Sequence, residues 1–180
     1  MTDTQLRGTS SASGDLVNSR QGEQLIVDAK LALRRLASSV CVVTCRHDGR
    51  NYAMTATSVS ALSMEPPSML VCVNRSAAFH RALNRASDFA INVLCRAQID
   101  ISRLCSGGAS PDGRFNVGDW DTRAAAPLLI DAQAAIVCRK DKALDYGTHT
   151  VFMGRIVSVS MNGDVDPLIY LDGQYTGRAA

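Results

Sequence analysis

The sequence predicts a mainly β protein with flanking helices, built on an antiparallel β-barrel. Short apolar segments with strand character follow one another through turns, without the regular strand–helix alternation of a doubly wound parallel sheet. Asp48-Gly49 lies between two of these segments, where such a pair favours a hairpin. A length of 180 residues and a hydrophobic content of 46% suit one domain with one core.

The N-terminal part predicts a tail followed by a helix. Residues 1–20 are rich in Ser, Thr, Gly and Asp, and Leu6, Leu16 and Val17 are their only large aliphatic residues. Such a segment cannot bury enough apolar surface to order itself, so we expect a flexible tail, with the domain occupying residues 21–180. From Gly22, apolar residues recur at helical spacing up to Leu36, which predicts an amphipathic helix.

The rest of the chain alternates strand segments with turns and two short helices. We expect strands at residues 39–45, 51–62, 69–74, 89–94, 134–139, 148–160 and 168–171, and helices at residues 76–86 and 98–105. Prolines 66 and 67 separate the second strand from the third, because proline lacks a ladder donor and restricts the preceding residue. Residues 106–121 form a loop rich in Gly, Asp and Pro.

Composition excludes several classes of function. The net charge is +2 with no dense Lys/Arg block, so nucleic acid is not expected as a partner. No apolar stretch approaches the roughly 18 residues that span a bilayer, and no secretory signal is visible, so we expect a cytoplasmic protein without membrane contact. The six cysteines lie mostly in apolar runs, as reduced core residues do, and their spacing predicts no metal site.

The segment from Ala53 to Leu62 is the most informative for function. Its apolar alternation changes parity near Thr57-Ser58, which predicts a bulge or a bend. Hydroxyl side chains surround this point, and small residues would let backbone N–H groups approach a phosphate. On composition alone, a polar-faced edge strand remains the simpler interpretation.

The run from Ser39 to Leu94 resembles the flavin reductase-like family of split-barrel FMN-binding proteins. The segments that carry the resemblance, in order, are Met54-Thr55-Ala56-Thr57-Ser58, Ser60-Ala61-Leu62-Ser63-Met64-Glu65-Pro66-Pro67, Val71-Cys72-Val73-Asn74-Arg75-Ser76, Phe89-Ala90-Ile91-Asn92-Val93-Leu94 and Asp112-Gly113-Arg114-Phe115. His149 before Val151-Phe152-Met153-Gly154-Arg155-Ile156, then Pro167-Leu168-Ile169-Tyr170 with Gly173 and Tyr175, extend the likeness to about residues 22–177. The order and spacing together are specific.

This resemblance implies a Greek-key split β-barrel of the FMN-binding type that forms a homodimer, with flavin sites near the dimer interface. It also implies a set of flavin-binding residues: Thr55, Ala56, Thr57 and Ser58 beside the ring and phosphate, Asn74, Ser76, His80 and Arg81 at the phosphate and ribityl chain, Asn92 and Val93 through their backbone, and Phe115, Tyr170 and Tyr175 as aromatic walls. Local alternatives stay open, since Ser76 can cap a helix, Asn92 can stabilise a turn, and the aromatic rings can pack on their own strands.

His149 is the candidate catalytic residue, because the family commonly has a histidine facing the side of the flavin where nicotinamide stacks. Thr148 precedes it here, where the family often has an aspartate that would help to fix the imidazole tautomer. A structural or surface role is the alternative.

The resemblance implies an NAD(P)H-dependent flavin reductase that transfers hydride from NADH, or alternatively NADPH, to FMN or FAD. Such chemistry needs no protein nucleophile, and the chain has neither a catalytic triad nor a dinucleotide-binding glycine motif. By analogy, the partner is a monooxygenase that acts on aromatic compounds and receives reduced flavin. The alternatives are a reductase of a corrinoid or ferric acceptor and a non-catalytic flavin-binding electron carrier.

Overall fold

The computed structural model describes residues 12–177, with side chains described from residue 21 onward. The chain divides into two compact units, Met1–Leu36 and Ala37–Ala180. In the first unit, helix α1 (Ala12–Leu33) begins ten residues earlier than the sequence pattern predicted, inside the segment expected to be a tail. Residues 1–11 of that expected tail lie outside the described part.

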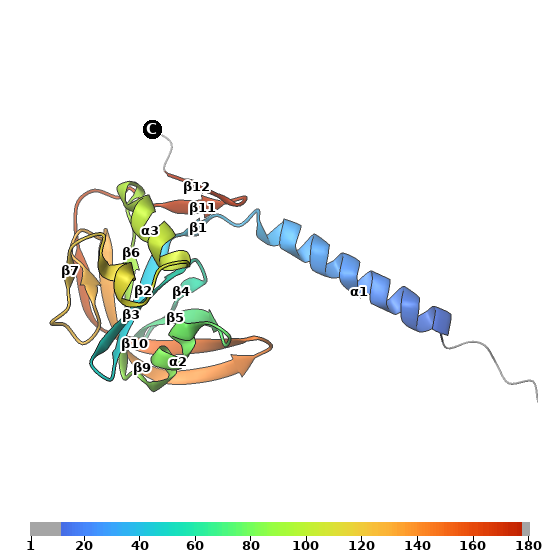
Figure 1. Cartoon of the computed structure of the whole chain (residues 1–180), viewed down its shortest axis with the longest axis horizontal. Coiled ribbons are helices and arrows are strands. Elements are labelled where there is room, and N and C mark those ends of the chain that lie inside the picture. Colours follow the sequence, from blue (N-terminus) through green and yellow to red (C-terminus); the bar gives the residue numbers. More distant parts are fainter. Residues whose placement is uncertain (1–11, 178–180) are drawn as a thin grey trace, which may run out of the picture. The chain divides into compact units, whose positions relative to one another are not determined.

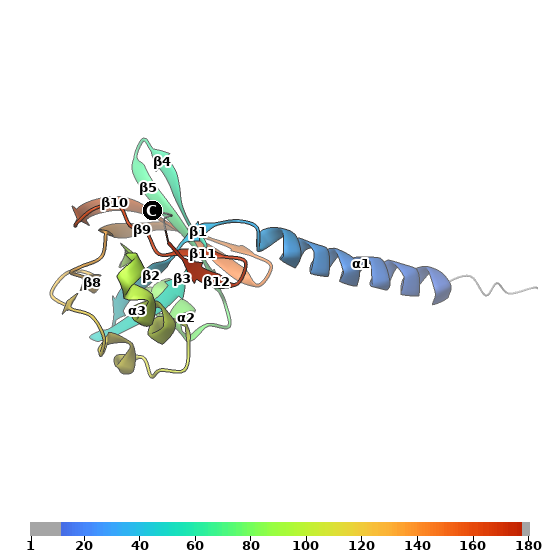
Figure 2. The ribbon, with the colours of Figure 1, turned by 90° about the horizontal axis from the view of Figure 1, so that it is seen from above.

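The second unit is built on a seven-stranded antiparallel sheet in the order β3-β2-β6-β9-β10-β5-β4 (Figures 1 and 2). Its strands are β2 (Cys41–His47), β3 (Arg50–Ala56), β4 (Val59–Met64), β5 (Pro67–Asn74), β6 (Asp88–Val93), β9 (Ala134–Tyr146) and β10 (His149–Met161). The two edge strands, β3 and β4, are consecutive in the chain and joined only by Thr57 and Ser58. The sheet therefore has to curl until its two edges come close together at this link.

Smaller elements surround this sheet. A three-stranded sheet has the order β1-β11-β12 and contains β1 (Ser38–Ser39), β11 (Ile169–Leu171) and β12 (Gln174–Thr176). A two-stranded pair joins β7 (Trp120–Asp121) to β8 (Leu128–Leu129). The helices are α2 (Ala78–Arg85) and α3 (Ile99–Ser106), with short 3₁₀ turns η1 (Arg96–Gln98) and η2 (Asp112–Phe115).

Strand β2 shows why the core has two sides. Its residues alternate, so Cys41 and Val43 enter one apolar cluster and Val40 and Val42, one residue out of phase, enter another. Helix α2 packs into the first cluster and helix α3 into the second. A strand buried on both faces appears in the sequence as a continuous apolar run, which is what residues 40–43 show.

The predicted architecture is confirmed as mainly β, antiparallel and flanked by helices. The parity change near Thr57-Ser58 is a break between β3 and β4 rather than a bulge within one strand. Strand β9 continues to Tyr146, seven residues past the predicted end, because its second half lacks an apolar alternation. All six cysteines are unpaired, and Cys41, Cys45, Cys105 and Cys138 are buried.

Within residues 12–177, none of the helices is both long enough and apolar enough to cross a membrane.

Candidate functional site

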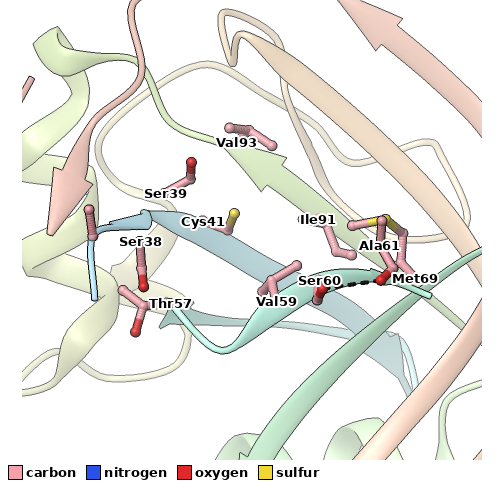
Figure 3. A pocket seen from close by; sticks show the side chains of 11 residues that line it. Ser38, Ser39, Cys41, Thr57, Val59, Ser60, Ala61, Met69, Ile91 and Val93 are labelled. Atoms are coloured by element: carbon pink, nitrogen blue, oxygen red, sulfur yellow. Dashed lines mark hydrogen bonds between the residues drawn. The ribbon is translucent and has the colours of Figure 1, made fainter. Parts of the chain in front are cut away.

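The link between β3 and β4 separates two neighbouring cavities. The first, here named the tyrosine cavity, has a volume of about 370 Å³ and is lined by Val40, Thr55, Ala56, Thr57, Ser106, Tyr170, Gly173 and Tyr175. The second, here named the sheet cavity, has a volume of about 320 Å³ and is lined by Ala37, Ser38, Ser39, Cys41, Thr57, Val59, Ser60, Ala61, Met69, Ile91 and Val93 (Figure 3). Thr57 lines both, so the predicted flavin segment lies where the two cavities meet.

The sheet cavity has apolar walls and a polar rim. Figure 3 shows Cys41 on β2, Ile91 and Val93 on β6, and Val59 on β4 around it. Burial raises the pKa of the Cys41 thiol to about 12, so the thiol stays neutral and behaves as an apolar wall. Hydroxyl groups of Ser38, Ser39, Thr57 and Ser60 belong to the same lining. This composition suits a flat aromatic ligand that carries polar groups at its edge.

The four hydroxyl groups near the link differ in how they are used. Thr55 Oγ1 donates to the Ser102 carbonyl at 2.6 Å, and Ser58 Oγ donates to the Cys72 carbonyl at 2.9 Å. Ser60 Oγ donates to the Ala61 carbonyl at 3.1 Å. Among the residues that the structure describes, only the Thr57 hydroxyl of these four has no partner. Its proton is therefore free for a ligand, whereas the other three offer lone pairs alone.

Tyr170 and Tyr175 form one wall of the tyrosine cavity. They face each other across β11 and β12, with ring centroids 5.4 Å apart and planes inclined by 66°. The Tyr175 hydroxyl lies 2.9 Å from Ser102 Oγ on α3, the residue whose carbonyl accepts the bond from Thr55. Helix α3 thus holds both the tyrosine wall and the end of β3 in place.

Asn74, Ser76 and His149 form a second group at the ends of β5 and β10. His149 is the register partner of Asn74. Asn74 Oδ1 accepts hydrogen bonds from the backbone N–H and the hydroxyl of Ser76, both at 2.9 Å. Ser76 does not cap α2, because the N-cap residue is Ala77 and it has no side-chain bond. These three exposed residues line neither cavity. Asn74 lies on β5 two residues after Cys72, whose carbonyl accepts the hydrogen bond from Ser58.

Thr148 occupies the position where an acidic neighbour of His149 was expected. Thr148 Oγ1 lies 2.9 Å from His149 Nδ1, so the hydroxyl orients the imidazole in place of a carboxylate. The turn that carries both residues is tied to β5, because the Arg75 backbone N–H donates to the Thr148 carbonyl at 2.9 Å and the Arg75 guanidinium donates to the Gly147 carbonyl. His149 Nε2 remains available on an exposed side chain.

Three of the predicted flavin-binding residues have side chains that contact other parts of the protein. His80 Nε2 lies 2.8 Å from Thr150 Oγ1, and its ring packs on Phe152. Asn92 is fully buried, and Phe115 packs edge-on against Trp120 with ring centroids 5.2 Å apart. None of these three side chains lines either cavity.

Val93 and Arg81 have different surroundings. Val93 lines the sheet cavity. Arg81 lies on a different face of α2, in a cavity that it shares with Arg85 and His47 and that has no residue in common with the other two.

The sequence interpretation missed Ser38, Ser39, Cys41, Met69 and Ile91 in the sheet cavity. Cys41 and Ile91 lie in continuous apolar runs, where nothing distinguishes a cavity wall from ordinary core. Ser38 and Ser39 belong to a two-residue strand that pairs with β11, more than 120 residues away, so no local pattern reveals their position.

Comparison with known proteins gives a consistent result. The family model described as "Flavin reductase like domain" matches residues 33–178. The chain is 42% identical over 149 residues to the reductase component of the FADH(2)-dependent resorcinol hydroxylase of Rhizobium sp. strain MTP-10005, covering 81% of this chain and 83% of the relative. It is 34% identical over 154 residues to the FMN reductase (NADH) RutF of Variovorax paradoxus, covering 85% and 86%.

A solved structure agrees with these relatives. The NADH:FAD oxidoreductase SgcE6 of Streptomyces globisporus, in complex with NAD and FAD fragments, superposes with a TM-score of 0.78 at 26% identity. The superposition covers 86% of this chain and 92% of that chain.

Proposed function

The chain belongs to the flavin reductase-like domain family, and from this premise we propose that it transfers hydride from NADH to FMN or FAD and delivers the reduced flavin to a separate oxygenase. The observation that carries the proposal is the pair of cavities meeting at Thr57 within the segment that resembles the family's flavin site. The NADH-dependent reductase relatives support the same reaction.

The residues present fit a flavin. The sheet cavity combines apolar walls with a hydroxyl rim, as an isoalloxazine ring requires, and the adjoining tyrosine cavity presents two aromatic rings. A bound flavin supplies the hydride acceptor, the N5 atom of its ring.

The protein's own residues bind and orient the flavin. Thr57 donates its free hydroxyl proton to the ligand, while Ala56 at the end of β3 leaves room for close approach of the backbone. Tyr170 and Tyr175 form an aromatic wall on which part of the ligand can pack. The Asn74 Nδ2 amide provides a donor for the phosphate end of the flavin, and Ser76 holds that amide in place through its two hydrogen bonds to Oδ1.

His149 is the proposed contact for the nicotinamide. Thr148 holds Nδ1 of the imidazole, so Nε2 remains free. The side chain is exposed at the end of the β5–β10 ladder, where His149 pairs with Asn74. Hydride transfer between two rings requires that they be held in close contact, and no acid or base on the protein has to take part.

We also propose that the enzyme is a homodimer with a split-barrel fold. The close approach of edge strands β3 and β4 supports a split barrel. Val157, Val159 and Met161 form an apolar stripe on β10 and are 54%, 51% and 79% exposed. In the described part of the chain, β5 pairs with β10 only as far as Arg155, so the later residues have an unpaired edge.

A second copy of the chain covers such a surface. Val159→Lys should therefore convert the dimer into a monomer in sedimentation velocity, whereas Ser158→Lys, on the opposite face of the strand, should not. Equal sedimentation of both variants as dimers would exclude this interface.

The oxygenase partner is proposed from the relatives. The resorcinol hydroxylase component is a reductase that serves a hydroxylase of an aromatic compound, which supports an aromatic monooxygenase as the acceptor here. The unpaired cysteines support our placement of the enzyme in the reducing cytoplasm.

Anaerobic stopped-flow absorbance tests the reaction. We expect rapid bleaching of the oxidised flavin band when protein with FMN or FAD is mixed with NADH, and slower bleaching with NADPH. Thr57→Val should weaken flavin binding, whereas Thr122→Val, an exposed threonine outside both cavities, should leave it unchanged. Flavin binding without bleaching above the protein-free rate would contradict the reductase assignment and favour an electron carrier.

A further inference from the structure

A third cavity lies beside α2, at the turn between β2 and β3. It has a volume of about 470 Å³ and is lined by His47, Asp48, Tyr52, Ala78, Arg81, Ala82, Arg85 and Pro111, and it is named here the arginine cavity. It shares no lining residue with the tyrosine or sheet cavity. It is therefore a separate feature from the proposed flavin site.

Arg81 and Arg85, which line this cavity, differ from the other arginines of residues 37–177 in having no acceptor partner. In residues 37–177, every other arginine contacts a carboxylate, an amide oxygen or a backbone carbonyl, for which the acceptors are Asn51, Ala53, Asp88, Asp100, Asp112, Asp121, Asp141, Asp145 and Asp166. Over the same range, the structure gives Arg81 and Arg85 no such partner. Both are exposed and lie four residues apart on α2, so two like charges share one helix face, an arrangement that an anion between them would stabilise.

His47 adds an unsatisfied polar atom to the same cavity. Although His47 ends β2 next to a turn, its side chain is only 23% exposed. His47 Nε2 is buried without a hydrogen-bond partner in the described part of the chain, although Asp48 Oδ2 lies 3.1 Å away outside hydrogen-bond geometry. A buried nitrogen of this kind is costly, and rotation of the ring into the cavity would let a ligand oxygen satisfy it.

The chemistry of the lining identifies the class of ligand. Guanidinium groups bind phosphate oxygens through paired hydrogen bonds, and two of them beside an imidazole form a phosphate-binding set. Tyr52, Pro111 and the two alanines add apolar surface, and the volume is far larger than one phosphate ion requires. The carboxylate of Asp48 repels phosphate but accepts hydrogen bonds from ribose hydroxyls.

We propose that the arginine cavity binds the phosphate and ribose of a nucleotide, with Arg81 and Arg85 on the phosphate. The adenylate half of a dinucleotide and a free mononucleotide present the same chemistry. Such binding does not require the reductase activity.

Calorimetric titration of the full-length protein with AMP, adenosine and inorganic phosphate tests the proposal. We expect AMP to bind at least tenfold more tightly than adenosine or phosphate alone. The double variant Arg81→Gln/Arg85→Gln should lose at least tenfold in AMP affinity. The control, Arg103→Gln/Arg155→Gln, removes two exposed arginines that lie outside the cavity and should bind AMP normally.

The absence of AMP binding, or equal AMP affinity in both double variants, would overturn the proposal. Circular dichroism of both variants checks that they are folded. A rise in the KM for NADH confined to the Arg81/Arg85 variant would identify the adenylate half of the dinucleotide as the ligand. An unchanged KM together with lost AMP binding would identify a free mononucleotide.

Discussion

Asn92 has a fully buried side chain that joins separate parts of the fold. Its Nδ2 donates to the Val42 carbonyl at 3.0 Å on β2, and its Oδ1 accepts from the Leu129 backbone N–H at 2.8 Å on β8. Both ends of the amide are therefore used inside the protein, and the side chain has no free group for flavin.

Asn92→Ala should lower the free energy of unfolding by about 2–4 kcal/mol, because it removes two hydrogen bonds and leaves the Leu129 N–H buried without a partner. Urea titration measures the change. Asn84→Ala, at an exposed position on α2, is the control and should change stability by less than about 0.5 kcal/mol. An unchanged free energy of unfolding in Asn92→Ala would show that these two hydrogen bonds do not stabilise the fold.

The Thr148–His149 hydrogen bond makes a different prediction, one about catalysis. His149→Ala should slow flavin reduction by NADH while leaving the Kd for flavin unchanged, because the proposed contact is with nicotinamide alone. Thr148→Val removes one neutral hydrogen bond, worth about 0.5–1.5 kcal/mol, and should reduce kcat/KM for NADH by roughly twofold to tenfold. Thr176→Val, away from this pair on β12, should behave as wild type, and an equal effect of all three changes would contradict the role of His149.

At the scale of elements, β10 combines the longest pairing in the sheet with a close approach to its neighbours. It pairs with both β5 and β9, and its register with β9 shifts between Met153 and Gly154. A Cβ atom on Gly154 would lie 2.7 Å from Phe89 Cε1 and 2.9 Å from Cys138 Cβ. The glycine lets β10 pass over the Phe89 ring, which is fully buried.

Gly154→Ala should destabilise the protein by about 1–3 kcal/mol, since the added methyl group has to displace a packed ring or a strand. Thermal and urea unfolding measure this effect. Gly107→Ala is a suitable comparison, because no heavy atom lies within 4 Å of its Cβ position and its φ of 163° is extended backbone. Equal stability of the two variants would show that β10 can shift to accommodate a side chain.

At the scale of the whole molecule, four buried thiols couple the stability of the core to alkaline pH. Burial raises the pKa of Cys41, Cys45 and Cys138 to about 12 and that of Cys105 to about 11, from an ordinary value of 9.0. These thiols lie in the two clusters on opposite sides of β2, so ionisation affects both halves of the core.

The direction of this pH dependence is set by the state, folded or unfolded, that binds the thiol protons more tightly. The folded protein holds these protons above pH 9 while the unfolded chain releases them, so their contribution is complete below pH 9 and is lost as the pH rises towards 12. The free energy of unfolding should fall by up to about 1.4 kcal/mol per pH unit for each thiol. Burial lowers the pKa of Lys140, which acts in the opposite direction but as one group against four.

Urea unfolding at pH 7.5, 9 and 10.5 measures this dependence. The free energy should be nearly constant between the first two values and lower at the third. Cys138→Ala should reduce the slope above pH 9, and Cys95→Ala, at a half-buried position, serves as the comparison. A slope that is the same in both variants and the wild type would exclude thiol ionisation as its cause.

Much of the fold could be predicted because it depends on local patterns. The continuous apolar run of β2, the Asp48-Gly49 turn and the parity change at Thr57-Ser58 each specify an element from neighbouring residues alone. The prediction for β9 ended early because its exposed second half has no apolar periodicity. Strand β1 was not predicted because its pairing partner, β11, is far along the chain.

The sequence by itself determined the fold class, the family resemblance and the segment at which the flavin site is proposed. Tertiary structure alone decided which side chains face a cavity. Thr57 and Thr55 are both hydroxyl residues of one segment, but only the contact with α3 shows that the Thr55 proton is already used. Arg81 was expected beside Ser76, but helix rotation and the β2–β3 turn place it with His47 in another cavity. Strand parity and helix phase are local properties, whereas the partner of each side chain depends on which distant elements pack together.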